Sequence, residues 1–119
     1  MSKTKLPIVS VESNLHKTIK IMSKFNYGVA VVLDKNKKIV GIFTDGDLRR
    51  TLQKYSDLRN LKIRDIMTKK PFTIGSDILA AEALNILESN EITSLLIKSN
   101  TNQLLGIITL NAILRAGIE

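Results

Sequence analysis

The sequence predicts an α/β (α+β) fold built from two β-α-β-β-α repeats related by a pseudo-twofold axis. One observation is an internal repeat: Gly-Ile-Phe-Thr at 41–44 recurs as Gly-Ile-Ile-Thr at 106–109, an offset of 65 residues. Another is that apolar positions match at the same offset, as Ile19 does with Leu84. Repeated units that stack around a shared core show this kind of self-similarity.

Length and composition limit the class of protein. The chain of 119 residues is long enough for one compact domain or for two half-domains that share a core. The absence of cysteine excludes a disulfide framework, a thiolate metal site and a cysteine nucleophile. The longest apolar run, Val29–Leu33, is far shorter than the roughly 20 residues of a membrane helix. Residues 1–5 are not followed by an apolar stretch that resembles a signal peptide, so we expect none. We therefore expect a cytoplasmic protein without membrane association.

The net charge of +7 raises the question of nucleic-acid binding. The basic residues are scattered, with no run of five, and no aromatic residues alternate with them as single-strand binders require. A solvated basic surface with a local anion site explains the charge better, and we do not expect nucleic acid to be a partner.

The first repeat is predicted to span residues 1–60, with its core at 7–53. Ser13 is a candidate cap for its first helix, and Asp45 or Asp47 is expected to begin its second helix, which continues through Leu52. The expected elements, in order, are an extended segment at Pro7–Val11, a helix at Asn14–Lys24, and strands at Val29–Leu33 and Ile39–Thr44 around a polar turn.

The second repeat is predicted to span residues 61–119, with its core at 66–116. A short helical piece, Ile63–Met67, is expected ahead of Pro71, and Ser76 is the candidate cap of the longer helix. No capping box is evident there, although Glu82 lies three residues after Leu79. The expected elements are an extended segment at Pro71–Ile74, a helix at Asp77–Ser89, strands at Ser94–Ile97 and Leu104–Thr109, and a helix at Leu110–Ala116.

The segment whose side chains are best suited to binding a ligand is Gly-Ile-Phe-Thr-Asp-Gly-Asp-Leu-Arg-Arg at 41–50. It places a hydroxyl, a carboxylate and the free amides of a helix start on one loop. Such amides attract phosphate, and a carboxylate can accept from the two hydroxyls of a ribose. Alternatively, Asp45 or Asp47 only caps the helix, which is worth about 1 kcal/mol. Both aspartates could also hold Mg²⁺ beside a phosphate, although we expect no metal site.

The order of elements, the Asp-Ile-Met-Thr segment at 65–68 and the Gly-x-x-Thr-x-x-Asp loop at 41–47 resemble a tandem CBS-domain pair over essentially the whole chain. The resemblance implies that Thr44 and Asp47, with Asp45 in the same loop, bind the phosphate and ribose of AMP, ADP or ATP in a cleft between the repeats. It also implies an opposing wall in the second repeat, formed by Thr73, Ile92, Thr93 and Ser94.

A narrower resemblance rests on segments 41–50, 66–68, 79–84 and 114–118. They are similar to the C-terminal CBS pair of bacterial arabinose-5-phosphate isomerases, which make the precursor of Kdo, a sugar of lipopolysaccharide or capsule. The resemblance implies a regulatory fragment that lacks the N-terminal sugar-isomerase domain, with Met1 an added start. Such a fragment would have no catalytic residue and would require no cofactor. Its ligand would be an adenine nucleotide or CMP-Kdo; a stand-alone nucleotide sensor or a purely structural module are the alternatives.

The two loops differ at one decisive position. In the second loop, Ala112 stands where the first loop has Asp47, and its methyl group cannot accept from a ribose. Asn111 carries an acceptor but lies one position early. The sequence therefore predicts one competent site and one degraded site per chain.

Two further expectations concern single helix faces. His16, the only histidine, is expected to be solvated rather than catalytic or metal-binding. The apolar stripes of the two long helices are expected to be broader than one small core can cover, so a homodimer through these helices is predicted, as is common for CBS pairs. The stripes contain Leu15, Ile19 and Met22 in the first repeat and Leu84 and Leu87 in the second.

Overall fold

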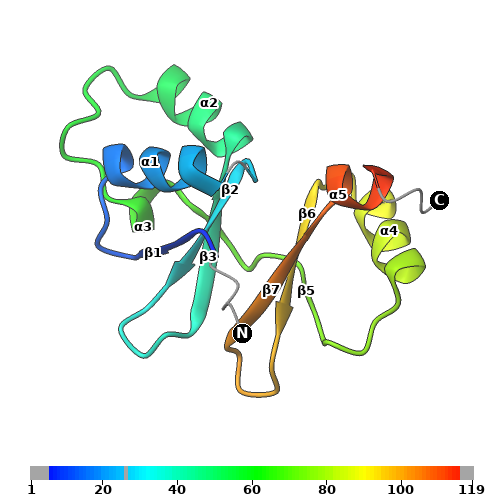
Figure 1. The fold of residues 1–119 in the computed structure, drawn as a ribbon. Helices are drawn as coiled ribbons and strands as arrows, with labels where there is room; N and C mark the ends of the chain where they lie inside the picture. The colour runs from blue at the N-terminus through cyan, green and yellow to red at the C-terminus, as the bar shows by residue number, and fades with distance from the viewer. Residues whose placement is uncertain (1–5, 26, 116–119) are drawn as a thin grey trace. The chain divides into compact units, whose positions relative to one another are not determined.

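The computed structural model describes residues 6–25 and 27–115, which form two compact units, Met1–Lys70 and Pro71–Glu119 (Figure 1). We call them unit 1 and unit 2. Of the sequence predictions, those on Met1, on Ala116 at the end of the last helix and on the final part of the 114–118 motif lie outside the described residues. None of the described helices is long and apolar enough to cross a membrane.

Unit 1 holds a four-stranded sheet in the order β1-β2-β3-β4. β1 runs parallel to β2, and the other neighbouring strands are antiparallel. Along the chain its elements are β1 (Ile8–Ser10), α1 (Leu15–Phe25), β2 (Val29–Leu33), β3 (Ile39–Thr44), α2 (Asp45–Lys54), α3 (Ile63–Ile66) and β4 (Thr68–Lys69).

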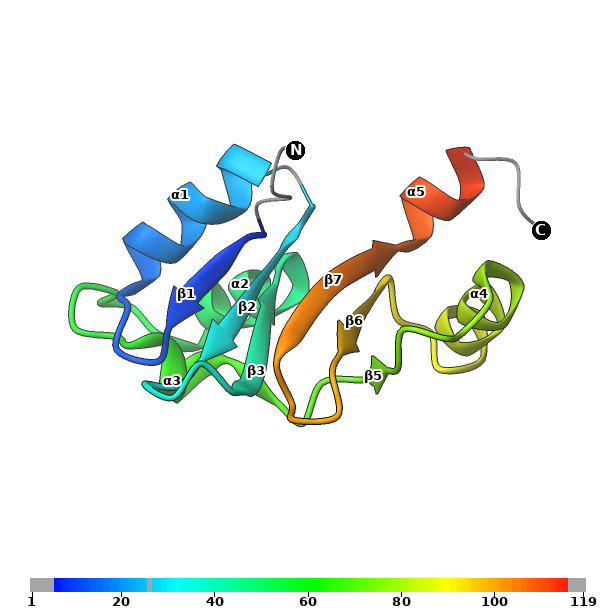
Figure 2. The same ribbon diagram turned by 60° about the horizontal axis from the view of Figure 1, so that its bottom comes forward.

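Unit 2 holds a three-stranded sheet in the order β5-β6-β7, whose strands lie side by side in Figure 2. β5 is parallel to β6, and β6 is antiparallel to β7. Its elements are β5 (Thr73–Ile74), α4 (Ala80–Ser89), β6 (Ser94–Lys98), β7 (Leu104–Thr109) and α5 (Leu110–Arg115). The predicted β-α-β-β-α order is confirmed in both units, whereas β4 was not predicted.

The internal repeat extends to the register of the strands. In unit 1, Val32 pairs with Gly41 and the register then shifts at Leu33. In unit 2, the equivalent Ile97 pairs with Gly106, and the register shifts at the next residue. Every pair of the β2–β3 ladder recurs in β6–β7 at the 65-residue offset, so the same backbone framework carries both loops.

The turn between the strands is also repeated, although its sequence is not. Lys37 and Asn102, 65 residues apart, both have a positive φ, near 60°. In unit 1, Asp34 Oδ1 accepts from the amides of Asn36 and Lys38, at 2.8 and 3.0 Å. In unit 2, Ser99 Oγ accepts from the amides of Thr101 and Gln103, each at 3.2 Å. Asp34 and Ser99 therefore stabilise their turns in the same way, because each has a short side chain whose oxygen accepts from the turn amides.

Each unit has its own apolar core, and the helix stripes lie inside these cores. Leu15 and Met22 are 4% and 6% exposed, and Leu84 and Leu87 are 5% and 0% exposed. The reason given above for a homodimer, a surplus of apolar helix surface, is thus wrong for these residues. The unit 1 core contains Val9, Leu15, Met22, Ala30, Val32, Phe43 and Ile63, and the unit 2 core contains Ile74, Ala83, Leu84, Leu87, Leu95 and Ile113.

Two helix starts differ from their predictions. α1 is capped by Asn14, whose Oδ1 accepts from Lys17 N at 2.8 Å, because the Ser13 hydroxyl is already used in accepting from Ser10 N. α4 begins at Ala80 rather than Asp77. Leu79 has extended backbone angles and is the N-cap, so the helix cannot begin earlier. The side chain of Leu79 has no acceptor. Glu82 Oε1 nevertheless accepts from its amide at 3.1 Å, which is one half of a capping box.

Residues 61–70 pack with unit 1, whereas the sequence analysis placed them in the second repeat, residues 61–119. Ile63 is fully buried in the unit 1 core, and its amide donates to the carbonyl of Ser13 at 2.8 Å. Glu12 forms ion pairs with Lys62 and Arg64, at 2.7 and 2.8 Å. The hydrogen bond from Lys62 lowers the pKa of Glu12 below its ordinary value. Burial of Ile63 and pairing of β4 with β3 explain why this segment belongs with unit 1 structurally.

The added strand β4 makes the two equivalent glycines unequal. A Cβ on Gly41 would lie 2.7 Å from Met67 Sδ and 2.7 Å from the carbonyl oxygen of Thr68. On Gly106 it would lie 3.5 Å from Ile97 Cδ1, an ordinary contact. β4 therefore approaches β3 so closely that only glycine fits at position 41.

We predict that Gly41→Ala lowers the free energy of unfolding by about 1–3 kcal/mol, because the methyl group must push β4 away. The matched control Gly106→Ala is expected to change it by less than about 1 kcal/mol. Urea unfolding of both variants measures the difference. Equal effects of the two substitutions would contradict the close approach of β4.

Candidate ligand-binding loop

The loop between β3 and α2 is a complete helix cap. Thr44 ends β3 with extended backbone angles, and its Oγ1 accepts from Asp47 N at 3.2 Å. In return, Asp47 Oδ2 accepts from Thr44 N at 2.9 Å, which forms a capping box. The amide of Asp45 donates to the carbonyl of Gly28 at 3.2 Å, which attaches the helix start to the residue before β2.

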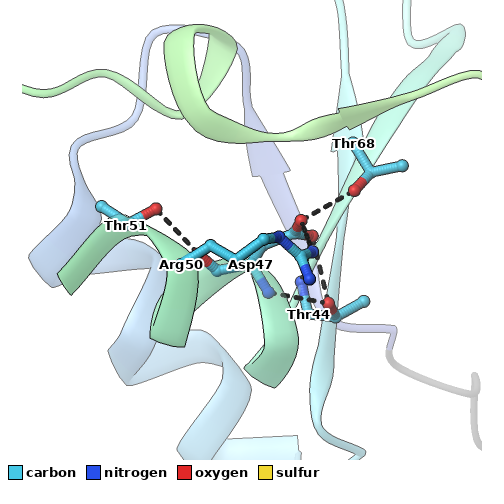
Figure 3. A network of polar contacts seen from close by, with 5 residues as sticks. All are labelled: Thr44, Asp47, Arg50, Thr51 and Thr68. Atoms are coloured by element: carbon cyan, nitrogen blue, oxygen red, sulfur yellow. Dashed lines mark hydrogen bonds and ion pairs between the residues drawn. The ribbon is translucent and has the colours of Figure 1, made fainter. Parts of the chain in front are cut away.

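The carboxylate of Asp47 is the centre of a polar network (Figure 3). Asp47 is only 5% exposed, yet it has partners on both oxygens. Oδ2 accepts from the amide and, at 3.1 Å, from the hydroxyl of Thr44. Oδ1 accepts from Arg50 Nη2 at 2.5 Å and from Thr68 Oγ1 at 2.8 Å. An ionised carboxylate offers about four lone-pair sites, so its accepting capacity is filled.

The four donors differ in how easily they can be replaced. The two groups of Thr44 belong to the cap itself. The side chain of Arg50 is 65% exposed, so water can reach its guanidinium, although the carboxylate that it contacts is only 5% exposed. Thr68 lies on the exposed strand β4. The Oδ1 atom is therefore the side of the carboxylate at which an incoming hydroxyl could exchange with Arg50 or Thr68 at small cost.

Thr68 is the site residue that sequence reasoning missed. The Asp-Ile-Met-Thr segment served only as a sign of the family, and nothing in its spacing indicated contact with Asp47, 21 residues earlier. The contact exists because Thr68 is opposite Ile42 in the β3–β4 pair, beside the end of β3. A signal could have come from recognising 68–69 as a strand, but two residues are too few for a periodic pattern.

The second loop keeps the cap and lacks the carboxylate. Thr109 Oγ1 accepts from Ala112 N at 3.2 Å, as Thr44 accepts from Asp47 N. Ala112 has no group to return a hydrogen bond, and Asn111 is exposed. Among the described residues of unit 2, no polar network equivalent to that of Asp47 is present.

The residues predicted from unit 2 lie near this second loop or on the neighbouring strands. Thr93 accepts at its carbonyl from Leu110 N at 2.9 Å, and Ser94 is opposite Thr109 in the β6–β7 pair. Ile92 packs against the unit 2 core. Thr73 is on β5, which is separated from β7 by β6.

Other groups offer little chemistry. Asp45 is exposed beside Gly28, and His16 is exposed on α1. Within the described ranges 6–25 and 27–115, no group of three or more histidine, aspartate or glutamate side chains could hold a metal ion. The loop at 44–47 and its partners Arg50 and Thr68 are thus the best candidate for a functional site.

Comparison with known proteins identifies the family of this arrangement. The model of the CBS domain matches residues 1–54 and again residues 63–119. The chain belongs to the CBS-domain family. A solved CBS domain pair in complex with 5-methylthioadenosine and S-adenosyl-L-methionine is 22% identical, with a TM-score of 0.85 over 98% of this chain and 90% of that chain. A CBS domain protein from Pyrobaculum aerophilum complexed with AMP is 17% identical, with a TM-score of 0.82 over 97% and 92%.

A curated relative adds a narrower likeness. The chain is 41% identical to the arabinose 5-phosphate isomerase KdsD of Yersinia pestis over 115 residues, or 97% of the chain. The chain spans about 35% of the length of that relative. Both resemblances drawn from the sequence, to a tandem CBS pair and to the CBS region of these isomerases, are confirmed.

We predict that Asp47→Ala lowers the free energy of unfolding by about 1.5–3 kcal/mol, because it removes half of a capping box and the buried acceptor of Arg50 and Thr68. The control Asp45→Ala removes an exposed carboxylate of the same loop, and we expect a change within about 0.5 kcal/mol. Denaturant unfolding gives both values. A tolerated Asp47→Ala would mean that the network contributes nothing to stability.

Proposed function

We propose that this chain is a regulatory CBS module that binds an adenine nucleotide or a nucleotide sugar at the loop of Thr44 and Asp47. The observation that carries the proposal is the filled but exchangeable Asp47 carboxylate at the start of α2. Support also comes from the similar CBS structures, one complexed with AMP and another with 5-methylthioadenosine and S-adenosyl-L-methionine. All three ligands contain an adenosine group.

In the proposed complex the ribose hydroxyls donate to Asp47 Oδ1 in place of Arg50 and Thr68. The hydroxyl of Thr44 and the first amides of α2 contact the phosphate, since helix N-termini favour anions. The released guanidinium of Arg50 can then pair with the phosphate, which recovers a charge-assisted hydrogen bond. Asp45 is a further proposed contact of this loop. Thr73, Ile92, Thr93 and Ser94 remain our prediction for the ligand contacts supplied by unit 2.

The likeness to KdsD supports a wider proposal: the chain is the regulatory part of an arabinose 5-phosphate isomerase, acting in the cytoplasm on the route to Kdo. CMP-Kdo is then a second candidate ligand, as a downstream product. We also propose that the chain forms a homodimer. The chain alone should show no isomerase activity. In a longer protein that includes an isomerase domain, the ligand should change the rate, and Asp47→Ala should remove that change.

One observation favours a purely structural module instead. The Asp47 carboxylate has all its partners within unit 1, so the loop is complete without a ligand. A module of this kind would mediate assembly only. The regulatory and the structural module differ in ligand affinity. A ligand can regulate the protein only if it binds one conformational state more tightly than another.

Isothermal titration with AMP, ADP, ATP and CMP-Kdo should detect binding of at least one of them, at about one molecule per chain. Asp47→Ala should weaken that binding about 10- to 150-fold, since a charge-assisted hydrogen bond is worth about 1.5–3 kcal/mol. Thr109→Val in the second loop is the control and should leave the affinity unchanged. Ala112→Asp should create at most a weak second site. No heat with any of the four compounds would favour the structural module.

Arg50 provides a sharper test of the exchange at Asp47 Oδ1. Adenosine must displace Arg50 and gives it no phosphate to bind, so Arg50→Ala should tighten adenosine binding about 2- to 5-fold. AMP offers a phosphate to the released guanidinium, so the same variant should weaken AMP binding. Titrations of both ligands into both proteins make the comparison. A change of the same sign for adenosine and AMP would contradict the exchange.

A further inference from the structure

Five lysines lie at one end of the unit 1 sheet. Three of them are in the turn between β2 and β3, residues 34–38, whose sequence is Asp-Lys-Asn-Lys-Lys. The other two end β4 and follow it, and Lys69 is opposite Gly41, so the chain continues from there toward the turn. At a rise of about 3.3 Å per residue and a strand spacing of about 4.8 Å, the two segments lie within roughly 10–15 Å of each other. We call these lysines the basic end of unit 1: Lys35, Lys37, Lys38, Lys69 and Lys70.

The positive charge of the basic end is not balanced within the chain. Among residues 6–25 and 27–115, the ion pairs involve none of its four exposed lysines, which are Lys35, Lys37, Lys69 and Lys70. Asp34, the acidic residue of the turn, uses its Oδ1 to accept from two turn amides. With five lysines and one aspartate, segments 34–38 and 68–70 together have a net charge of +4.

The fold does not require lysine in this turn. Lys37 N donates to the carbonyl of Asp34 at 2.9 Å, and in unit 2 Asn102 N donates to the carbonyl of Ser99 at 3.1 Å. The same turn therefore forms in unit 2 from uncharged residues. The residues equivalent to Lys35, Lys37 and Lys38 are Asn100, Asn102 and Gln103.

The backbone at two of these lysines is one that lysine seldom adopts. Lys37 has a φ of 63° and Lys70 a φ of 57°. Among residues 6–25 and 27–70, they are the only residues other than glycine with a positive φ. Asparagine adopts this region more readily than lysine does, and unit 2 has Asn102 there, with a φ of 61°. Unit 1 thus keeps positive charge at a position where an uncharged residue would suit the backbone better.

The basic end is separate from the ligand-binding loop. β3 starts at Ile39, next to the turn, and ends at Thr44, six residues later, which is about 20 Å along the strand. Figure 1 shows the turn at the end of the hairpin that points away from α2. An anionic partner of the turn is therefore not the ligand of Asp47.

We propose that the basic end of unit 1 is a docking site for an acidic segment of a partner polypeptide, rich in aspartate and glutamate. The tip of a hairpin is convex, so it does not enclose a small anion, but it can lie against a row of carboxylates. An extended segment advances about 3.3–3.6 Å per residue, so about four acidic residues span the basic end. Charge complementarity of this kind gives recognition and fast association.

Other anionic macromolecules need groups that the basic end lacks. Segments 34–38 and 68–70 contain no aromatic residue to stack on the bases of single-stranded nucleic acid. They also contain no apolar residue to enter the interface of a membrane. Carboxylates on a polypeptide need only the lysines themselves.

Binding of a labelled hexaglutamate peptide to the full chain tests the proposal. Fluorescence anisotropy in about 0.05 M NaCl should show binding, which should weaken as salt increases because screening reduces the attraction. Lys35→Asn/Lys37→Asn gives unit 1 the residues of unit 2 at these positions and should weaken the binding about 3- to 25-fold. The same variant should melt at the wild-type temperature or above it, because asparagine suits the positive φ of residue 37. A loss of binding is then not a loss of fold.

Two controls separate the basic end from other properties of the chain. Lys17→Gln/Lys20→Gln removes the same two charges from the exposed face of α1 and should leave the binding of hexaglutamate unchanged. Titration with AMP should give the same affinity for the wild type and for Lys35→Asn/Lys37→Asn. A chain that binds hexaglutamate but not AMP would contradict the proposed function and leave the docking site intact.

Three outcomes would overturn the docking site. The first is a wild-type chain that does not bind hexaglutamate at low salt. The second is an equal loss of binding in Lys35→Asn/Lys37→Asn and Lys17→Gln/Lys20→Gln, or no loss in the former, since the attraction would then come from net charge alone. The third concerns the kind of partner: a single-stranded oligonucleotide of about six nucleotides, or phosphatidylserine vesicles, bound more tightly than hexaglutamate and released by Lys35→Asn/Lys37→Asn, would assign the basic end to phosphates.

Discussion

The carboxylate of Asp47 joins parts of unit 1 that are far apart in the sequence. Its hydrogen bonds with Thr44 end β3 and start α2, and its bond with Thr68 attaches β4 to the same point. A buried ionised group is costly unless its acceptors are filled, so the positions of these partners are not independent. The interaction that makes the cap stable is also the one that a nucleotide would have to open.

The two units show how one backbone framework can carry unequal surfaces. Strand register, the register shift and the turn are shared, down to the positive φ at Lys37 and Asn102. The differences lie in one side chain of the loop and in the added strand of unit 1. Asp47 is replaced by Ala112, and β4 lies beside Gly41 whereas β7 is the last strand of its sheet. Because main-chain pairing maintains the framework, these side chains can diverge without loss of the fold.

Charge follows the same division. The core-facing positions of α1 and α4 are apolar in both, as in Met22 and its equivalent Leu87, while the exposed Lys17 of α1 has the exposed Glu82 as its equivalent in α4. Exposed charges contribute little to the stability of a unit, so they can be selected for recognition.

The sequence by itself determined the repeat and the order of strands and helices, and it indicated that Thr44 and Asp47 lie at the start of α2. β2, β3 and β7 begin and end at the predicted residues, because continuous β-branched and apolar runs between polar turns are a strong local signal. Capping by Asp47, one of the two roles that the sequence suggested, is what its hydrogen bonds with Thr44 show. The tertiary structure decided which residues contact one another across the chain. Thr68 reaches Asp47 only through the pairing of β4 with β3, and the apolar stripes of α1 and α4 are covered by their own units rather than left for a partner. Contacts between residues distant in the chain depend on how strands pair and helices pack, and no local pattern in the sequence encodes them.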